Sequence, residues 1–301
     1  MAIKKTSAHY GKGSCNGTFG ELVQGIKDNQ PFLITFPIAE LRSIALFTPD
    51  NECGIVFETL AHQKAALACN KLLAYFNQKG GGRLRLLSTI PKGKGMASSS
   101  ADIVAAMKAV ANCFSLPLTK ELISQIACEI EPTDGVMYRD IVAYDYINGQ
   151  LIEELGQLPP WQLIGFDLGG TVDTLGYNQQ EKNYTLTQLN ELKQAYQLVK
   201  EGIIQQHLGS ILCASTISTR INQHMCEKPY FEEFEKLSAC LGGGLLTAHS
   251  GTMLGILKNP AFDTKEQIYQ EEILLDFNRR TGLSPIFYTN VNQLSQPLPS
   301  L

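Results

Sequence analysis

The chain has 301 residues, of which 44% are hydrophobic and 18% charged, and its formal net charge is −4. This composition excludes a disordered or collagen-like chain, and the absence of a basic excess argues against nucleic acid as a partner. The eight cysteines form no Cys-x-x-Cys pair, and no signal segment begins the sequence, which favours reduced thiols in a cytoplasmic protein over zinc or disulfides. No apolar run approaches the roughly 20 residues that cross a bilayer, so we expect no membrane partner.

The apolar pattern predicts strands and helices in irregular alternation, and therefore a mixed α+β fold. In chain order it predicts strands at 31–36 and 42–47, a helix at 64–77, a strand at 83–90, a helix from near Ser100, a helix at 119–130, a strand at 161–168, helices at 185–203 and 230–241, a strand at 252–257, a helix at 264–276 and a strand at 284–290. The consecutive prolines within 157–160 predict a division into two lobes, 1–157 and 158–301.

A loop suited to phosphate binding lies between the strand at 83–90 and the helix after it. Its sequence is Ile90-Pro91-Lys92-Gly93-Lys94-Gly95-Met96-Ala97-Ser98-Ser99-Ser100. The glycines permit close approach of the backbone, and the start of the helix presents N–H groups and the positive end of its dipole. A glycine-rich turn before an ordinary capped helix is the alternative. The loop does not match the P-loop pattern, so the chemistry needs another scaffold.

Four other segments combine glycine with polar or acidic residues. They are residues 13–25, 128–135, 166–174 and 241–252. Taken alone, the first is typical of a loop, and the last is typical of a helix C-cap followed by a turn. The acidic residues in the other two are typical of turns, where they also occur without catalytic function.

Together these segments resemble the signatures of the GHMP kinases, the superfamily of galactokinase, homoserine kinase, mevalonate kinase and phosphomevalonate kinase. Pro91-x-x-x-Gly95-x-x-Ser98-Ser99 resembles the central signature, and residues 13–25 and 241–252 resemble the N- and C-terminal ones. Gly-Glu-Leu-Val-Gln-Gly at 20–25 and the segment at 166–174 resemble the branch that contains the L-threonine kinase of cobalamin side-chain synthesis. The resemblance implies a two-lobed fold with mixed sheets, packed helices and an ATP site in the cleft between the lobes.

The resemblance also implies a role for each segment. Residues Lys92, Gly93, Lys94, Gly95, Met96, Ala97, Ser98, Ser99 and Ser100 would surround the phosphates of ATP. Ser99 and Glu129 would bind Mg²⁺, with Glu131 as a competing ligand. Asp134 would activate the acceptor hydroxyl. The acceptor would be held by Thr18, Glu21, Gln24, Asp173, Thr174, Ser250, Gly251 and Thr252.

The expected activity is therefore phosphorylation of the side-chain hydroxyl of an amino acid, with ATP and Mg²⁺, and L-threonine is the leading acceptor. Phosphoryl transfer requires mainly positioning and charge neutralisation, which this set of residues can supply. Homoserine or another amino alcohol is the alternative acceptor. A catalytically silent ligand-binding protein of the same fold is the alternative from another class. The sequence leaves the oligomeric state open, a homodimer included.

Overall fold

The structure is a computed structural model that describes residues 10–50, 54–57, 62–172, 182–261 and 263–290. Its strands are β1 (Gly11–Lys27), β2 (Gln30–Asp50), β3 (Gly54–Phe57), β4 (Gly81–Ser88), β5 (Ile141–Asp145), β6 (Gln150–Gly156), β7 (Gln162–Asp167), β8 (Gly244–Thr247), β9 (Met253–Lys258) and β10 (Ile286–Thr289). Its helices are α1 (Gln63–Tyr75), α2 (Ser98–Phe114), α3 (Lys120–Cys128), α5 (Leu186–Ile204), α6 (Leu208–Gln223), α7 (Phe231–Leu241) and α8 (Thr264–Thr281). The fold is mixed α+β, as expected.

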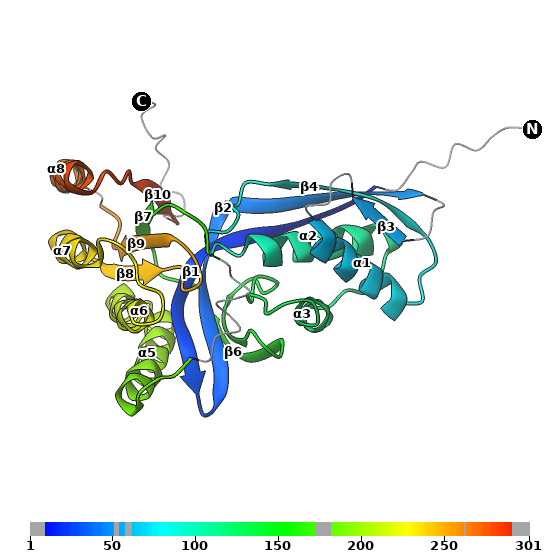
Figure 1. The fold of residues 1–301 in the computed structure, drawn as a ribbon, viewed down its shortest axis with the longest axis horizontal. Helices are drawn as coiled ribbons and strands as arrows, with labels where there is room; N and C mark the ends of the chain where they lie inside the picture. Colours follow the sequence, from blue (N-terminus) through cyan, green and yellow to red (C-terminus); the bar gives the residue numbers. More distant parts are fainter. Residues whose placement is uncertain (1–9, 51–53, 58–61, 173–181, 262, 291–301) are drawn as a thin grey trace, which may run out of the picture.

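One sheet runs through the molecule in the order β10-β7-β9-β8-β1-β2-β4-β3, and β5 joins β2 and β6 beside it. Its centre is the long antiparallel hairpin of β1 and β2 (Figure 1). The register of this hairpin shifts at three points between residues 16 and 23. Such bulges bend a strand and redirect its side chains. The pairing of Glu21 with Thr247 then joins β1 to β8, so the bulged part of β1 lies beside the turn that follows β8.

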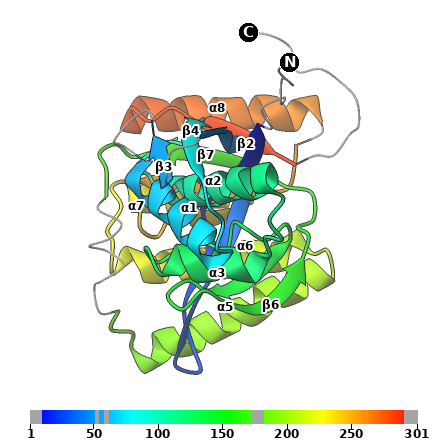
Figure 2. The same cartoon turned by 90° about the vertical axis from the view of Figure 1, so that its right-hand side faces the viewer.

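The helices form two groups (Figures 1 and 2). α1 and α2 lie near β2, β3 and β4, and α3 packs beside α1 and α2, whereas α5, α6, α7 and α8 lie at the other end of the molecule. α2 forms because its alanines favour a helix and its larger apolar residues, among them Ile103 and Met107, are buried against the sheet. At the other end the rings of Phe166, Phe234 and Phe277 pack with centroids 5.0–5.2 Å apart. The boundary between lobes at residue 157 stays a prediction.

The expected helices at 64–77, 119–130, 185–203, 230–241 and 264–276 are confirmed as α1, α3, α5, α7 and α8, and α2 begins at Ser98 rather than near Ser100. The two strands expected at 31–36 and 42–47 are one strand, β2. The sequence pattern missed β1, β3, β5, β6, β8 and α6. The expectation of a loop at 13–25 was wrong because a glycine-rich segment with weak strand propensity is held extended by its pairing with β2.

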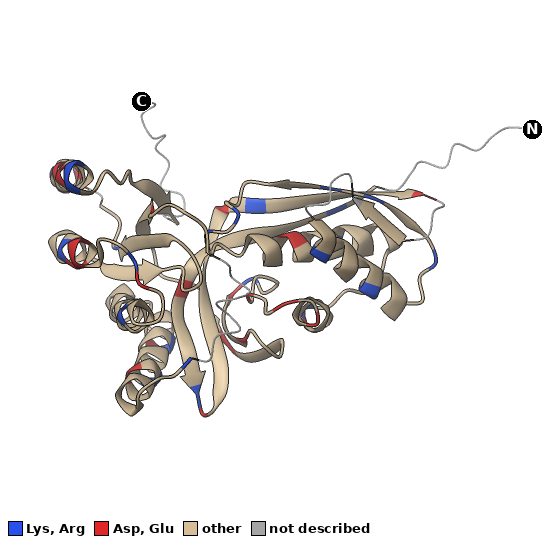
Figure 3. Cartoon of the chain, viewed as in Figure 1, with Lys and Arg blue, Asp and Glu red and all other residues tan. Residues whose placement is uncertain are grey.

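Charged residues of both signs are interspersed over the ribbon, including α7 and α8 (Figure 3). Within the described part of the chain, no helix combines the length and apolar character needed to traverse a bilayer.

Candidate active site

The predicted phosphate loop joins β4 to α2 and turns through three residues with positive φ. These are Gly93 (70°), Gly95 (75°) and Ala97 (57°). Ala97 is the N-cap of α2 and supplies no side-chain hydrogen bond to the helix. The first-turn amides therefore have no cap, and they lie at the positive end of the helix dipole. This arrangement suits a phosphate group.

The glycine-rich segment after β8 packs directly against this loop. The Thr252 N–H donates to the Lys94 carbonyl at 3.2 Å. A Cβ on Gly251 would lie 2.0 Å from the same carbonyl oxygen, so this contact requires glycine. Although residues 94 and 252 are far apart in sequence, the two signatures thus form one continuous structure around the pocket.

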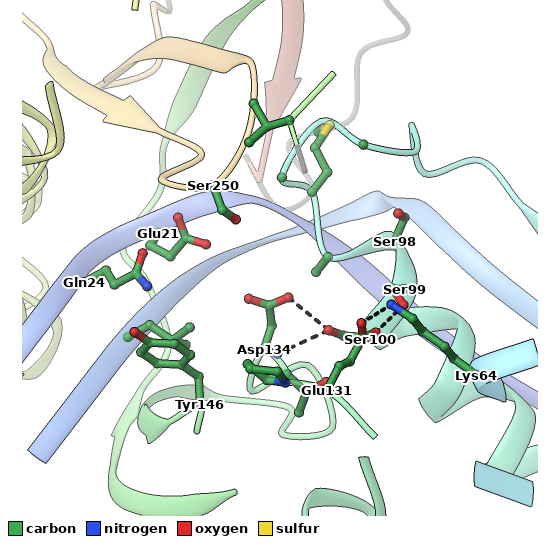
Figure 4. Close-up of a pocket in the computed structure, with 18 residues that line it drawn as sticks. Glu21, Gln24, Lys64, Ser98, Ser99, Ser100, Glu131, Asp134, Tyr146 and Ser250 are labelled. Carbon is green, nitrogen blue, oxygen red and sulfur yellow. Dashed lines mark hydrogen bonds and ion pairs between the residues drawn. The ribbon is translucent and has the colours of Figure 1, made fainter. Parts of the chain in front are cut away.

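A pocket opens beside the loop and brings together segments from much of the described chain. It is lined by Glu21 and Gln24 of β1, Leu33 of β2, Lys64 of α1, residues 93 and 95–100, residues 131–134, Tyr146, Val172 and Ser250. Figure 4 shows that the pocket has two ends. We call the end with Lys64, Ser99 and Glu131 the phosphate end, and the end with Glu21, Gln24 and Tyr146 the acceptor end; Asp134 lies between Glu21 and Ser99.

The phosphate end is built around the carboxylate of Glu131. Ser99 Oγ donates to one of its oxygens and Lys64 Nζ to the other. Glu131 is buried in the turn that follows α3. A hydroxyl and a carboxylate at the start of α2 provide two hard oxygen ligands beside the phosphate loop.

The expectation that Glu129 supplies the metal-binding carboxylate needs correction. Glu129 is the C-cap of α3, and its side chain is exposed and paired with Lys71 at 2.7 Å. It does not line the pocket. Two residues later the chain has turned inward, so Glu131, the competing residue, takes the position beside Ser99.

Asp134 is held in the centre of the pocket by Ser100. The Ser100 hydroxyl donates to Asp134 Oδ2 at 3.1 Å and accepts the Asp134 N–H at 3.2 Å. Burial, helped by the nearby carboxylates of Glu21 and Glu131, raises the pKa of Asp134 to about 7, against the hydrogen bond from Ser100. A carboxylate with such a pKa can take up a proton near neutral pH.

The acceptor end contains a buried network that fixes Glu21. The backbone N–H of His249 donates to Glu21 Oε2 at 2.9 Å, and His249 Nδ1 lies 2.9 Å from the same oxygen. His249 Nε2 lies 2.9 Å from Ser218 Oγ, which accepts the Gln24 N–H at 3.1 Å. With Ser218 donating its own proton to Nε2, the ring proton belongs on Nδ1 and points at Glu21. Both contacts use Oε2, so within the described part of the chain Oε1 remains for a ligand.

Several predicted contacts lie outside this pocket. Lys92 is exposed, the Lys94 ammonium is paired with Asp167 Oδ2 at 2.7 Å, and neither lysine lines the pocket. The Thr252 hydroxyl also donates to Asp167, at 2.8 Å, and Gly251 packs against the Lys94 carbonyl. Of the three predicted residues in this segment, Ser250 alone lines the pocket.

Thr18 also departs from the expected arrangement. It lines a second pocket, with Cys15, Thr35 and Met137 among its neighbours, rather than the pocket of Glu21 and Gln24. The register shift between Thr18 and Glu21 explains the separation, because a bulge breaks the regular order of side chains along the strand. The predicted acceptor residues Asp173 and Thr174 lie outside the described residues.

Sequence reasoning missed four residues near this pocket: Lys64, Tyr146, Lys182 and His249. Lys64 and Tyr146 line it. Lys182 Nζ donates to the Tyr146 hydroxyl at 3.2 Å, and His249 fixes Glu21. Of these four, only His249 lies in a recognisable motif, next to Ser250 in the C-terminal signature.

The chain is similar to known kinases in sequence and in fold. Residues 61–142 match the model of the GHMP kinases N terminal domain. L-threonine kinase of Citrobacter freundii is 30% identical over 252 residues, covering 81% of this chain and 84% of the relative. L-threonine kinase of Salmonella typhimurium is 29% identical over 253 residues, covering 81% of each.

Solved structures share the fold at low sequence identity. Homoserine kinase from Cytophaga hutchinsonii superposes with a TM-score of 0.74 at 13% identity, covering 97% of each chain. L. major mevalonate kinase in complex with R-mevalonate gives 0.62 at 12% identity, covering 95% of this chain and 97% of the other. The fold, the matched domain and the relatives that cover most of the chain agree: the chain belongs to the GHMP kinase family and is an ATP-using phosphotransferase that acts on the hydroxyl group of a small molecule.

Proposed function

We propose that this kinase transfers the γ-phosphoryl group of ATP to the side-chain hydroxyl of L-threonine, giving O-phospho-L-threonine and ADP. The observation that carries the proposal is the position of Asp134 between the phosphate end and the acceptor end of one pocket. The L-threonine kinases that cover most of the chain support the choice of acceptor.

At the phosphate end, the uncapped start of α2 and the glycine-rich loop would bind the phosphates through backbone N–H groups. The donor set fits Mg²⁺, because Ser99 and Glu131 offer hard oxygens and Mg²⁺ needs only one or two protein oxygens beside phosphate and water. Among the described residues no three His, Cys, Asp or Glu side chains cluster as a metal cage. When bound, Mg²⁺ would neutralise charge on the β- and γ-phosphates.

At the acceptor end, Glu21 would bind the ammonium group of the amino acid through its remaining oxygen. The hydroxyl would then lie near Asp134, which accepts its proton as the oxygen attacks the γ-phosphorus and ADP departs. The raised pKa of Asp134 suits this transfer, because a base works best when its pKa is near the operating pH.

The proposal is tested by measuring kcat/KM for L-threonine, L-serine and L-homoserine with Mg-ATP. We expect L-threonine to exceed L-serine by roughly 10- to 200-fold, the range that one methyl group provides. A preference for L-homoserine would contradict the choice of L-threonine as the acceptor but would still agree with kinase activity. Absence of phosphorylation with every acceptor would favour a silent ligand-binding protein.

A further inference from the structure

A buried lysine outside the sequence motifs holds the turn that follows β8. Lys228 lies between α6 and α7 and is only 4% exposed. Its Nζ donates to the Gly251 carbonyl and also contacts Cys226 Sγ at 3.2 Å. Gly251 follows Ser250, which lines the active-site pocket (Figure 4). Lys228 itself does not line the pocket, so it acts on a bound ligand through this turn.

The end of α6 fixes the backbone of this lysine. The Lys228 N–H donates to Gln223 Oε1 at 2.8 Å, and the side-chain amide of Gln223 donates to the Lys228 carbonyl at 3.2 Å. The neighbouring Asn222 donates from its side chain to the His249 carbonyl at 3.3 Å. The helix thus holds the turn at two carbonyls, directly at His249 and through Lys228 at Gly251.

The turn held by Lys228 is in direct backbone contact with the phosphate loop. A Cβ on Gly251 would lie 2.0 Å from the Lys94 carbonyl oxygen and 2.6 Å from Gly95 Cα. A Cβ on Gly95 would in turn lie 2.8 Å from Gly251 Cα. Two backbones this close do not move independently, because protein interiors are close-packed and transmit displacement. The position of Gly251 therefore restricts the conformations of the loop at 93–100.

We propose that Lys228 is a positioning residue for ATP, because its ammonium holds Gly251 where the turn supports the phosphate loop. A hydrogen bond from a charged donor is stronger than one between neutral groups, so it suits a contact that resists displacement. Preorganised N–H groups bind phosphate more tightly than groups that must first be ordered. This inference rests on the proposed role of the loop in binding ATP, and it does not depend on which acceptor is phosphorylated.

The test compares Lys228→Met with Lys258→Met. Methionine keeps much of the lysine side chain but cannot donate a hydrogen bond. Lys258 is a matched control, because it is 3% exposed and donates to Glu266 and Gln270 of α8 rather than to the turn.

We expect Lys228→Met to raise both the KM for ATP and the Kd for Mg-ADP by about tenfold, since it removes the charged donor to Gly251. The KM for the acceptor should stay within about threefold, because the contacts that fix Glu21 are retained. Lys228→Arg keeps a charged donor and should bind Mg-ADP more tightly than Lys228→Met. Lys258→Met should leave both nucleotide constants within about twofold of wild type.

Isothermal titration calorimetry measures the Kd for Mg-ADP without turnover. A folded Lys228→Met with an unchanged Kd would overturn the inference, and so would an equal loss in Lys258→Met, because general destabilisation would then explain both. These outcomes would leave L-threonine phosphorylation standing. If no acceptor is phosphorylated, the proposed function fails, while the calorimetry still decides the role of Lys228.

Hydrogen exchange in the wild type tests the contact without any variant. If the turn and the loop form one unit, Mg-ADP should slow exchange of the amides at 251–252 together with those at 95–100. Protection confined to 95–100 would show that the turn does not support the bound loop, and it would overturn the inference.

Discussion

The two ends of the pocket are built in different ways. The phosphate end is centred on one stretch of chain, the loop at 93–100, to which Lys64 of α1 and Glu131, from a turn about 30 residues later, are added. The acceptor end gathers Glu21 of β1, Tyr146 after β5, Lys182 before α5 and His249 after β8. ATP chemistry is common to the family, so a local motif can encode it. The residues of the acceptor end are brought together by long-range packing, so that end can vary without changing the motif.

The largest expected effect concerns the carboxylate of the phosphate end. Glu131→Gln should lower kcat by about 1000-fold, because it removes the charged oxygen that, with Ser99, would hold the Mg²⁺ needed to neutralise charge on the transferred phosphoryl group. Glu129→Gln is the matched control, and it should stay within about threefold of wild type, because Glu129 is paired with Lys71 at the surface. Steady-state rates with saturating Mg-ATP measure both. Equal losses of kcat in the two variants would contradict the assignment of Glu131, rather than Glu129, to the phosphate end.

Asp134 joins the two ends, and Asp134→Asn should lower kcat by about 100-fold or more with little change in the KM for ATP. The amide preserves size but cannot accept the proton. In the wild type, kcat/KM for the acceptor should fall as pH falls through about 7, because the raised pKa of Asp134 lets protonation remove the base there. Asp134→Asn should lose this pH dependence. An unchanged profile in the variant would assign the ionisation to another group.

The hydrogen bonds that hold Glu21 should affect the KM for the acceptor but not the KM for ATP. His249→Leu removes the ring donor to Glu21 and should raise the acceptor KM by about tenfold, with the KM for ATP unchanged. His249→Asn places an amide nitrogen near the position of Nδ1 and should recover much of the loss. Initial rates with each substrate varied in turn separate these effects. If both variants are equally impaired, the hydrogen bond from Nδ1 is not what positions Glu21.

The smallest effect is expected at Thr18, which lines the second pocket. Its hydroxyl is buried and makes no hydrogen bond with the described residues. Thr18→Val should therefore change the acceptor KM by less than about twofold and raise the free energy of unfolding by up to about 1 kcal/mol. Kinetics and denaturant titration measure the two quantities. A large increase in acceptor KM would show that Thr18 does contact the acceptor.

Features that depend on local sequence could be predicted, whereas features that depend on long-range packing could not. The loop at 92–100 and the helix after it were evident because glycine, serine and an apolar stripe act locally. Helix α6 was missed because its apolar residues are mixed with serine and threonine, and its stability comes from packing on α5 and β8. β1 was missed because its extended form depends on β2.

The errors at single residues have physical causes that are not local. Glu129 and Glu131 differ by two positions, and the end of α3 decides which one faces Ser99. Thr18 and Glu21 are separated by a register shift that depends on the pairing of β1 with β2 and β8. Lys182 has no motif, and only the folded chain brings it to Tyr146.

The most direct test of the account is the identity and stoichiometry of the product formed from Mg-ATP and L-threonine, by phosphorus NMR and mass spectrometry, for the wild type and Asp134→Asn side by side. The account predicts one O-phospho-L-threonine for each ADP with the wild type, and the same product formed about 100-fold more slowly with the variant. ADP formed without phosphothreonine, or a wild type and variant of equal rate, would contradict a transfer in which Asp134 joins the two ends of the pocket.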